Sequence, residues 1–190
     1  TDNIMGAGYK GYSIYAQNFG GLLIGSNNIF PRGKSSIHFD NVARSSITGN
    51  RFHSFYPGML VFEGNCSENL VSSNHFLRDN EPWAPMLEYN NGLNDLYGLL
   101  CISGNYNSII ANHISIHGQS IHPAGEKPVI IHLTSGMGNY ISSNHIVATT
   151  EASSEQTEAS DSCFSAQVDA LTMTDQRVPL EVIAVLVEKE

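Results

Sequence analysis

The stretch "YISSNHIVA" at residues 140–148 is nearly a copy of "NLVSSNHFL" at residues 69–77. Similar phrases recur elsewhere, namely "LLIGSNNIF" (22–30), "SSITGNRFH" (45–53) and "SIIANHISI" (108–116). Each combines apolar residues, one or two small residues, an asparagine, a variable residue and then Ile or Phe. Because self-similarity at a fixed period is the sequence signature of solenoid folds, this repeat decides the architecture.

One asparagine in each phrase sets the period of the repeat. Together with an asparagine near the start of the chain, they are separated by 24, 23, 24, 38 and 32 residues. The first three separations indicate about two dozen residues per coil, and the last two contain insertions. Stacked asparagines can form a ladder of side-chain amides and tolerate the left-handed backbone of a corner. We therefore predict a structural column made of Asn3, Asn27, Asn50, Asn74, Asn112 and Asn144.

A second β-like run lies between successive asparagines. These runs are "YSIYAQ" (12–17), "SSIHFD" (35–40), "GMLVFE" (58–63), "GLLCIS" (98–103) and "PVIIHL" (128–133). No unit shows a convincing helical pattern, and the phrases lack the fixed leucines of a leucine-rich repeat. The sequence therefore predicts an all-β fold, a parallel β-helix in which each unit reads as strand, turn, strand, turn.

The repeat also predicts the domain organisation. We expect β-helix coils over residues 1–150, with insertions at 77–98 and 115–128, followed by an acidic loop at 151–162 and a C-terminal β segment at 163–190. The sequence begins within a repeat unit, and no segment that would cover the exposed edge of the first coil is recognisable before it. We therefore expect this chain to be the C-terminal part of a longer protein.

Composition excludes several classes of function. The net charge is −9 with only 9 basic residues, which argues against nucleic acid or an anionic membrane as a partner. No apolar run has the length of a membrane span. Cys66, Cys101 and Cys163 are an odd number in dissimilar contexts, so we predict buried thiols and no disulfide framework.

Three histidines, His75, His113 and His145, directly follow asparagines of the predicted column. Because their spacing follows the repeat, we expect them to form a column on the outside of the solenoid. A zinc site would be better supported with a carboxylate in reach, and none lies at this offset. The sequence therefore predicts no metal site, and we expect no cofactor.

Several long phrases in the same order carry a family resemblance. The phrases "NNIFPRGKSSIHF" (27–39), "FYPGML" (55–60), "ENLVSSNH" (68–75) and "NGLNDLYGLL" (91–100) resemble the C-terminal half of inulin fructotransferases. With the difructose-dianhydride hydrolases, those enzymes form glycoside hydrolase family 91. The likeness runs from Thr1 to about Thr150.

The resemblance implies a right-handed parallel β-helix that assembles as a homotrimer. It implies an enzyme that cleaves terminal difructosyl units of inulin to difructose dianhydride by intramolecular fructosyl transfer. The alternative is a hydrolase that opens the dianhydride, for example dianhydride III to inulobiose. A transferase is expected to be secreted and a dianhydride hydrolase to be cytoplasmic. The family's catalytic Asp and Glu are expected upstream of Thr1, and the catalytic residues of this chain stay unknown.

Glycosyl transfer through an oxocarbenium-like state needs carboxyl groups that share one face. Asp40 and Glu63 close equivalent strands 23 residues apart, so the period places them near one column. Because side chains alternate along a strand, Phe39 and Phe62 are expected inside, with Asp40, Glu63 and His38 outside. We predict that these three polar side chains contact substrate, with two solvated corner carboxylates as the alternative.

The insertion at 77–98 contributes Arg78, Asp79, Glu81 and Trp83 as further candidate substrate contacts, because long loops on a rigid scaffold usually carry function. Trp83 can either stack on a sugar ring or anchor a subunit contact. On another loop between coils, Arg32 is a candidate for a sugar hydroxyl, a neighbouring subunit's carboxylate, or solvent.

Two other classes of protein stay open. A polygalacturonase or pectate lyase also uses a β-helix, but its acidic polymer calls for a basic cleft, which this acidic chain does not suggest. A trimeric spike or adhesin segment would have no catalytic role at all. Neutral oligofructose, inulin or a difructose dianhydride fits the composition better.

Overall fold

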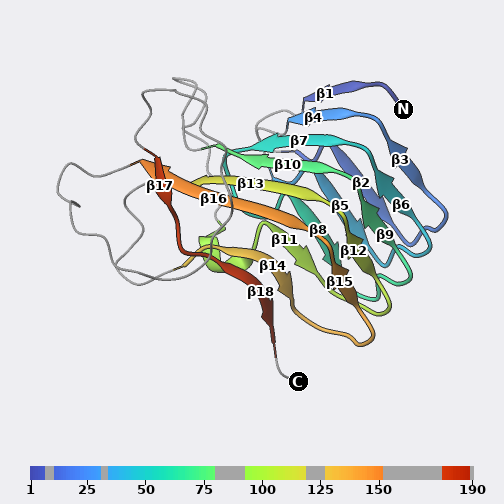
Figure 1. The fold of residues 1–190 in the computed structure, drawn as a ribbon. Helices are drawn as coiled ribbons and strands as arrows, with labels where there is room; N and C mark the ends of the chain where they lie inside the picture. Colours follow the sequence, from blue (N-terminus) through green and yellow to red (C-terminus); the bar gives the residue numbers. More distant parts are fainter. Residues whose placement is uncertain (7–10, 31–33, 80–92, 119–126, 152–176, 189–190) are drawn as a thin grey trace.

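A computed structural model describes residues 1–6, 11–30, 34–79, 93–118, 127–151 and 177–188. The strands stack as the coils of a parallel β-helix, with the N-terminus at one end and β18 at the other (Figure 1). Every pairing between successive coils is parallel, and each coil adds one strand to each of three sheets. The predicted β-helix is therefore confirmed.

The three sheets differ in length. Sheet A has seven strands, β1 (Ile4–Gly6), β4 (Asn28–Phe30), β7 (Arg51–Ser54), β10 (His75–Arg78), β13 (His113–Gly118), β16 (His145–Glu151) and β17 (Arg177–Pro179). Sheet B has six, β2 (Ile14–Gln17), β5 (Ile37–Asp40), β8 (Leu60–Glu63), β11 (Leu100–Ile102), β14 (Val129–Leu133) and β18 (Ile183–Val187). Sheet C has five, β3 (Leu23–Gly25), β6 (Ser46–Thr48), β9 (Leu70–Ser72), β12 (Ser108–Ile110) and β15 (Tyr140–Ser142).

Each coil contains three strands, so the expectation of two strands per unit is wrong. The asparagine phrase holds two strands separated by a corner, as in β3 and β4. The two strands are separated by the residue before each asparagine, which has a positive φ, for example 54° at Ser26 and 54° at Ser73. This left-handed conformation turns the chain from sheet C into sheet A, and we call the turn the C–A corner.

The predicted asparagine ladder fills the C–A corner. The Asn50 Nδ2 donates to Asn74 Oδ1 at 3.0 Å, and Asn74 Nδ2 donates to Asn112 Oδ1 at 3.0 Å. The same oxygen of Asn74 also accepts from the backbone N–H of Asn50 at 2.9 Å. Similar bonds join Asn3 to Asn27, Asn27 to Asn50 and Asn112 to Asn144. Each amide therefore satisfies buried backbone groups of the neighbouring coil, and this locks the register.

A second asparagine ladder, which the repeat analysis missed, lies in the turn from sheet B to sheet C, the B–C corner. Asn69 Nδ2 donates to Asn107 Oδ1 at 3.0 Å, and Asn107 Nδ2 donates to Asn139 Oδ1 at 3.1 Å. Earlier coils have Leu22 and Ser45 in this column, so the asparagine signal is absent from the coils before Asn69.

The core between the sheets is apolar and stacked in register. The rings of Phe39 and Phe62 stack with centroids 5.3 Å apart, and those of Phe52 and Phe76 with centroids 4.6 Å apart. All four side chains are buried. Burial of each side chain of this size contributes about 1.5–3 kcal/mol.

The C-terminal segment returns to the solenoid. Strand β17 pairs with β16 in the antiparallel sense, and β18 pairs with β14 in the parallel sense. In the described part of the predicted C-terminal β segment, Ile183–Val187 forms the last strand of sheet B. Among the described residues, no helix has the length and apolarity needed to cross a bilayer.

Candidate functional site

The outer face of sheet B, near the B–C corner, brings the predicted polar residues together. Asp40 and Glu63 are paired in the register between β5 and β8. Their neighbours Phe39 and Phe62 point into the core, so the two carboxylates and His38 face outward, as predicted. The period of the sequence was therefore sufficient to place these three side chains on one face.

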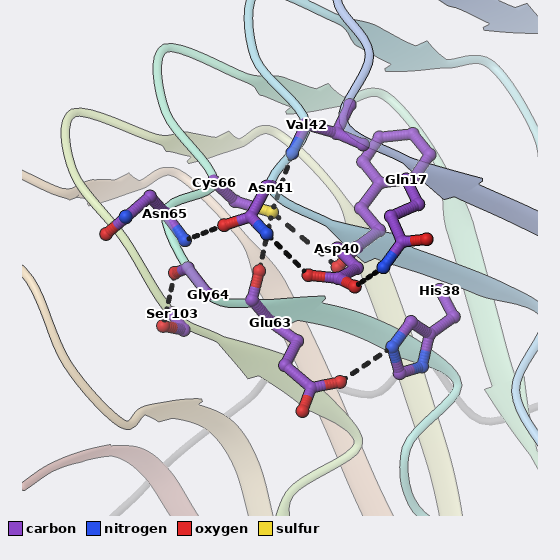
Figure 2. A network of polar contacts seen from close by, with 11 residues as sticks. Gln17, His38, Asp40, Asn41, Val42, Glu63, Gly64, Asn65, Cys66 and Ser103 are labelled. Atoms are coloured by element: carbon purple, nitrogen blue, oxygen red, sulfur yellow. Dashed lines mark hydrogen bonds and ion pairs between the residues drawn. The ribbon is translucent and has the colours of Figure 1, made fainter.

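The carboxylate of Asp40 is held as a hydrogen-bond acceptor by two amides (Figure 2). Gln17 Nε2 from the preceding coil donates to Asp40 Oδ2, and Asn41 Nδ2 donates to Asp40 Oδ1 at 2.9 Å. Both oxygens are thus oriented before any ligand arrives. An ionised carboxylate can accept several more hydrogen bonds, for example from sugar hydroxyls.

Glu63 has a different partner. Its Oε2 lies 2.9 Å from His38 Nε2, and the His38 side chain is only 13% exposed while that of Glu63 is 66% exposed. The imidazole is therefore packed against the sheet and the carboxylate reaches solvent. Asp40 and Glu63 are stacked in register, but each is bonded to its own partner and they do not form an isolated carboxylate pair.

An aromatic cluster beside His38 is the part of the site that the sequence analysis missed. The ring centroids of Tyr12 and Tyr15 are 5.3 Å apart, and that of His38 lies 4.9 Å from Tyr12 and 5.4 Å from Tyr15. The ammonium of Lys34 lies 5.2 Å from the Tyr12 ring centroid. Tyr15 is 49% exposed, so part of its ring is open to a ligand. In the parallel register, Tyr15 is paired with His38, and His38 with Val61. This alignment follows from the repeat length, so the sequence could have predicted the contact between Tyr15 and His38.

Desolvation, and after it the charge of Asp40, raises the pKa of the Tyr15 hydroxyl. A phenol whose pKa is raised stays protonated at neutral pH, so the Tyr15 hydroxyl is available as a hydrogen-bond donor beside Asp40. The face therefore combines a fixed carboxylate, a protonated phenol, a histidine–glutamate pair and exposed aromatic area.

Further along the same face, the outward side chains are covered by the segment around η2, a short 3-10 helix (Asp95–Tyr97). Val61, Cys101 and His132 follow one another in the register and are all buried. Burial raises the pKa of the Cys101 thiol to about 11 and also raises that of the Tyr97 hydroxyl. Cys101 is therefore a neutral thiol at physiological pH, which is the wrong state for a nucleophile.

The B–C corner next to Asp40 is held by side-chain hydrogen bonds. The backbone N–H of Asn65 donates to Asn41 Oδ1 at 2.9 Å, and the Cys66 thiol donates to the Glu63 carbonyl at 3.3 Å. Burial raises the pKa of the Cys66 thiol as well. The prediction of buried, unpaired thiols is confirmed for Cys66 and Cys101, and Cys163 lies outside the described residues.

Arg78 and Asp79 are not part of the same cluster. Arg78 Nη1 pairs with Asp95 Oδ1 at 2.5 Å, with both side chains less than a fifth exposed, and Arg78 Nε donates to the Phe55 carbonyl at 3.3 Å. Asp79 Oδ2 lies 3.9 Å from His53 Nε2. These residues lie at the turn from sheet A into sheet B, whereas Asp40 and Glu63 end the strands of sheet B. The structure thus separates the two groups of predicted contacts.

The other predicted contacts, Arg32, Glu81 and Trp83, lie outside the described residues. So do most of the acidic loop at 151–162 and residues 163–176 of the predicted C-terminal β segment. In the described ranges, no group of three or more His, Cys, Asp or Glu side chains is arranged to hold a metal ion. The chemistry of the described site therefore rests on the outer face of sheet B.

Comparisons with known proteins agree with this architecture. The sequence profile of a family described as the β-helix repeat of inulin fructotransferase matches residues 73–180. The inulin fructotransferase (DFA-I-forming) of Arthrobacter globiformis is 35% identical in an alignment of 187 positions that covers 94% of this chain and 46% of the relative.

Two solved structures extend the comparison. DFA-IIIase from Arthrobacter chlorophenolicus A6 in complex with DFA-III is 57% identical with a TM-score of 0.83, over 99% of this chain and 42% of that chain. The same enzyme in complex with GF2 is 60% identical with a TM-score of 0.74, over 78% of this chain and 36% of that chain. The chain thus spans less than half the length of each of these relatives.

Proposed function

Because this chain belongs to the family of inulin fructotransferase β-helix repeats, we propose that it acts on bonds between fructosyl units, in inulin or in a difructose dianhydride. The family match over residues 73–180 is the observation that carries the proposal. The outer face of sheet B supports it, because exposed rings beside fixed carboxylates suit a neutral, hydroxyl-rich ligand.

Within this proposal, opening of the dianhydride is the reaction to test first. The identity to DFA-IIIase is 57% over 99% of the chain, against 35% to the DFA-I-forming transferase over 94%. Formation of a dianhydride from inulin is the second candidate, supported by the family match itself. The two reactions break or form the same type of bond at the anomeric carbon and differ in whether water or a fructose hydroxyl attacks.

The residues of the sheet B face have distinct roles in this proposal. The Asp40 carboxylate accepts hydrogen bonds from fructose hydroxyls, and the Tyr15 ring packs on the apolar side of a furanose ring. The His38–Glu63 pair can hold a proton between imidazole and carboxylate near the ligand. Arg78 does not contact the ligand in this proposal, because its guanidinium is paired with Asp95.

Assembly and compartment are further parts of the proposal. We propose a homotrimer, in keeping with the resemblance of the sequence phrases to the family. A dianhydride hydrolase would act in the cytoplasm and a transferase outside the cell. The acidic composition supports a neutral fructan as ligand and gives no basic surface for nucleic acid.

Product analysis by chromatography tests the function. The protein is incubated separately with inulin and with difructose dianhydride III, and binding of each is measured by calorimetry. Linear difructose from the dianhydride supports hydrolysis, and dianhydride from inulin supports the transferase. Binding without turnover supports the fructan ligand and contradicts activity of this chain by itself. Neither binding nor turnover would overturn the fructan proposal and favour a structural spike or adhesin.

A further inference from the structure

The outer face of sheet A gathers most of the histidines of the chain. Five of the 8 histidines lie on its strands, namely His53, His75, His113, His117 and His145. Three of them follow the asparagine ladder and stack in one column, with ring centroids 4.9 Å apart at each step. This confirms the predicted outer histidine column. It lies on a different sheet from the site described above.

The last two rings of the column approach each other through their nitrogens. His113 and His145 are paired in the register of β13 and β16, and their Nδ1 atoms are 3.1 Å apart, a hydrogen-bond distance at which the tautomers decide which nitrogen donates. Both rings are exposed. Their backbones are fixed, because each follows a ladder asparagine and Asn112 Nδ2 donates to Asn144 Oδ1 at 2.9 Å. Only side-chain torsions must be frozen when a ligand binds between the rings.

A neighbouring hydroxyl lies within hydrogen-bond distance of one ring and favours one of its tautomers. The Nε2 of His113 lies 3.0 Å from Ser115 Oγ, on the side of the ring away from His145. When Nε2–H donates to this hydroxyl, Nδ1 of His113 carries the free lone pair. A metal-binding imidazole usually has its second nitrogen held in this way, by a partner that fixes its tautomer.

From this geometry we propose that His113 and His145 form a two-imidazole chelate for a divalent transition metal of the Cu(II) or Ni(II) type. At a metal–nitrogen length of about 2.1 Å, two nitrogens 3.1 Å apart subtend an angle of roughly 95° at the metal. That angle matches neighbouring positions of a tetragonal site, which is the geometry of Cu(II) and Ni(II). Tetrahedral Zn(II), with the nitrogens about 3.4 Å apart, fits this separation less closely.

This proposal revises the expectation that the column binds no metal. That expectation rested on the lack of a carboxylate, but imidazole alone suits Cu(II) and Ni(II). Water fills the remaining positions, so affinity is lower than in a site with three or four protein ligands. Arg51, in the same column two strands away from His113, adds a positive charge that weakens binding further.

The test is a titration of the metal-free protein with Cu(II) against a competing chelator, at pH 7.5. The proposal expects one equivalent of Cu(II) with nitrogen hyperfine structure in the electron paramagnetic resonance spectrum. The variants His113→Gln and His145→Gln should each lose at least tenfold in affinity. The matched control is His53→Gln, a histidine on the same face outside the pair, and its affinity should stay within about twofold of wild type.

Two results would overturn the proposal. One is unchanged affinity in His113→Gln and His145→Gln, or an equal loss in the His53→Gln control, because binding would then be spread over surface histidines. The other is a loss in His75→Gln as large as that in His145→Gln, because the two-ligand assignment would then be wrong. Urea denaturation without metal should give equal stability for His145→Gln and wild type, which separates lost binding from lost folding.

Discussion

The C–A corner and the B–C corner both turn the chain from one sheet to the next, but only the C–A corner uses the same residue type in every described coil. At the C–A corner every described coil places an asparagine in the ladder. At the B–C corner the ladder starts only at Asn69, after Leu22 and Ser45. The register there pairs Asp40 with Glu63 but Ala43 with Ser67, so the later coil holds one extra residue.

The difference shows where a solenoid can vary. A corner that has an asparagine in every coil keeps the strands of successive coils in the same register. Its positions are occupied by structural side chains and are not free for binding or catalysis. In the irregular corner the Asn41 side chain points outward. Its amide donates a hydrogen bond to Asp40 and accepts one from the backbone N–H of Asn65. The candidate site lies beside this corner. The polar side chains of the site are therefore found where the length of the corner changes from one coil to the next.

The largest effect is expected from a glycine in the irregular corner. A Cβ on Gly104 would lie 1.8 Å from the carbonyl oxygen of Cys66, and its φ is +100°. Neither backbone can move without breaking the ladder, so Gly104→Ala should destabilise folding by more than about 3 kcal/mol. Urea denaturation measures this.

The control for that prediction is Gly21→Ala in the same corner of an earlier coil. Gly21 also has a positive φ, +75°, but its Cβ would meet nothing within 4 Å. Its cost should be about 1–2 kcal/mol, from the left-handed backbone alone. Equal costs at the two positions would contradict the role of the close backbone contact.

The next effect compares the two ladders directly. Asn74→Ala and Asn107→Ala each remove an amide that satisfies two buried backbone groups of the preceding coil. Each should cost about 2–4 kcal/mol in the free energy of unfolding. Asn65→Ala, an exposed asparagine of the B–C corner, should cost less than about 0.5 kcal/mol. A cost for Asn107→Ala as small as that for Asn65→Ala would show that only the C–A ladder is structural.

A smaller effect separates binding from folding at the B–C corner. Asp40→Asn should weaken binding of DFA-III or inulin at least tenfold, about 1.4 kcal/mol, because one carboxylate oxygen becomes a donor. Glu68→Gln is the matched control, since Glu68 lies in the same corner and is paired with the exposed Arg44. Calorimetry should show unchanged binding for this control. A similar loss in both variants would point to a general charge effect.

The smallest effect concerns pH. Burial, and then the charges of His113 and Arg51, lower the pKa of His75 in the folded protein below 6.5. The unfolded chain therefore takes up the proton first, and the contribution of His75 to stability, complete above pH 6.5, is lost as pH falls toward the folded pKa. Because the ring is partly solvated, the effect is below about 1 kcal/mol.

The variant His75→Gln isolates this contribution. It should flatten the dependence of unfolding free energy on pH between about 7 and 5, measured by urea denaturation in the presence of a chelator. A dependence identical to that of wild type would show that other groups control stability in this range.

The sequence predicted the regular features and missed the irregular ones for physical reasons. The spacing of Asn27, Asn50 and Asn74 was enough to predict the C–A ladder, and the outward positions of Asp40 and Glu63 followed from the same period. The third strand of each coil was missed because its boundary is a left-handed residue such as Ser26, which leaves little trace in composition.

The partners of the candidate residues required coordinates. The bond from Gln17 to Asp40 and the aromatic cluster around Tyr15 join neighbouring coils, so they depend on side-chain directions that a repeat length does not set. Arg78 was predicted as a substrate contact from its place at the start of an insertion. Its ion pair with Asp95 becomes visible only when the far end of that insertion is placed.

A crystal structure of this protein with DFA-III bound tests the central claim most directly, namely that the sheet B face beside the irregular corner contacts the fructosyl ligand. The account predicts ligand density over the Tyr15 ring, with a fructose hydroxyl within hydrogen-bond distance of Asp40. Ligand bound elsewhere, with the Gln17–Asp40 and His38–Glu63 contacts unchanged and the Tyr15 ring still exposed, would contradict it.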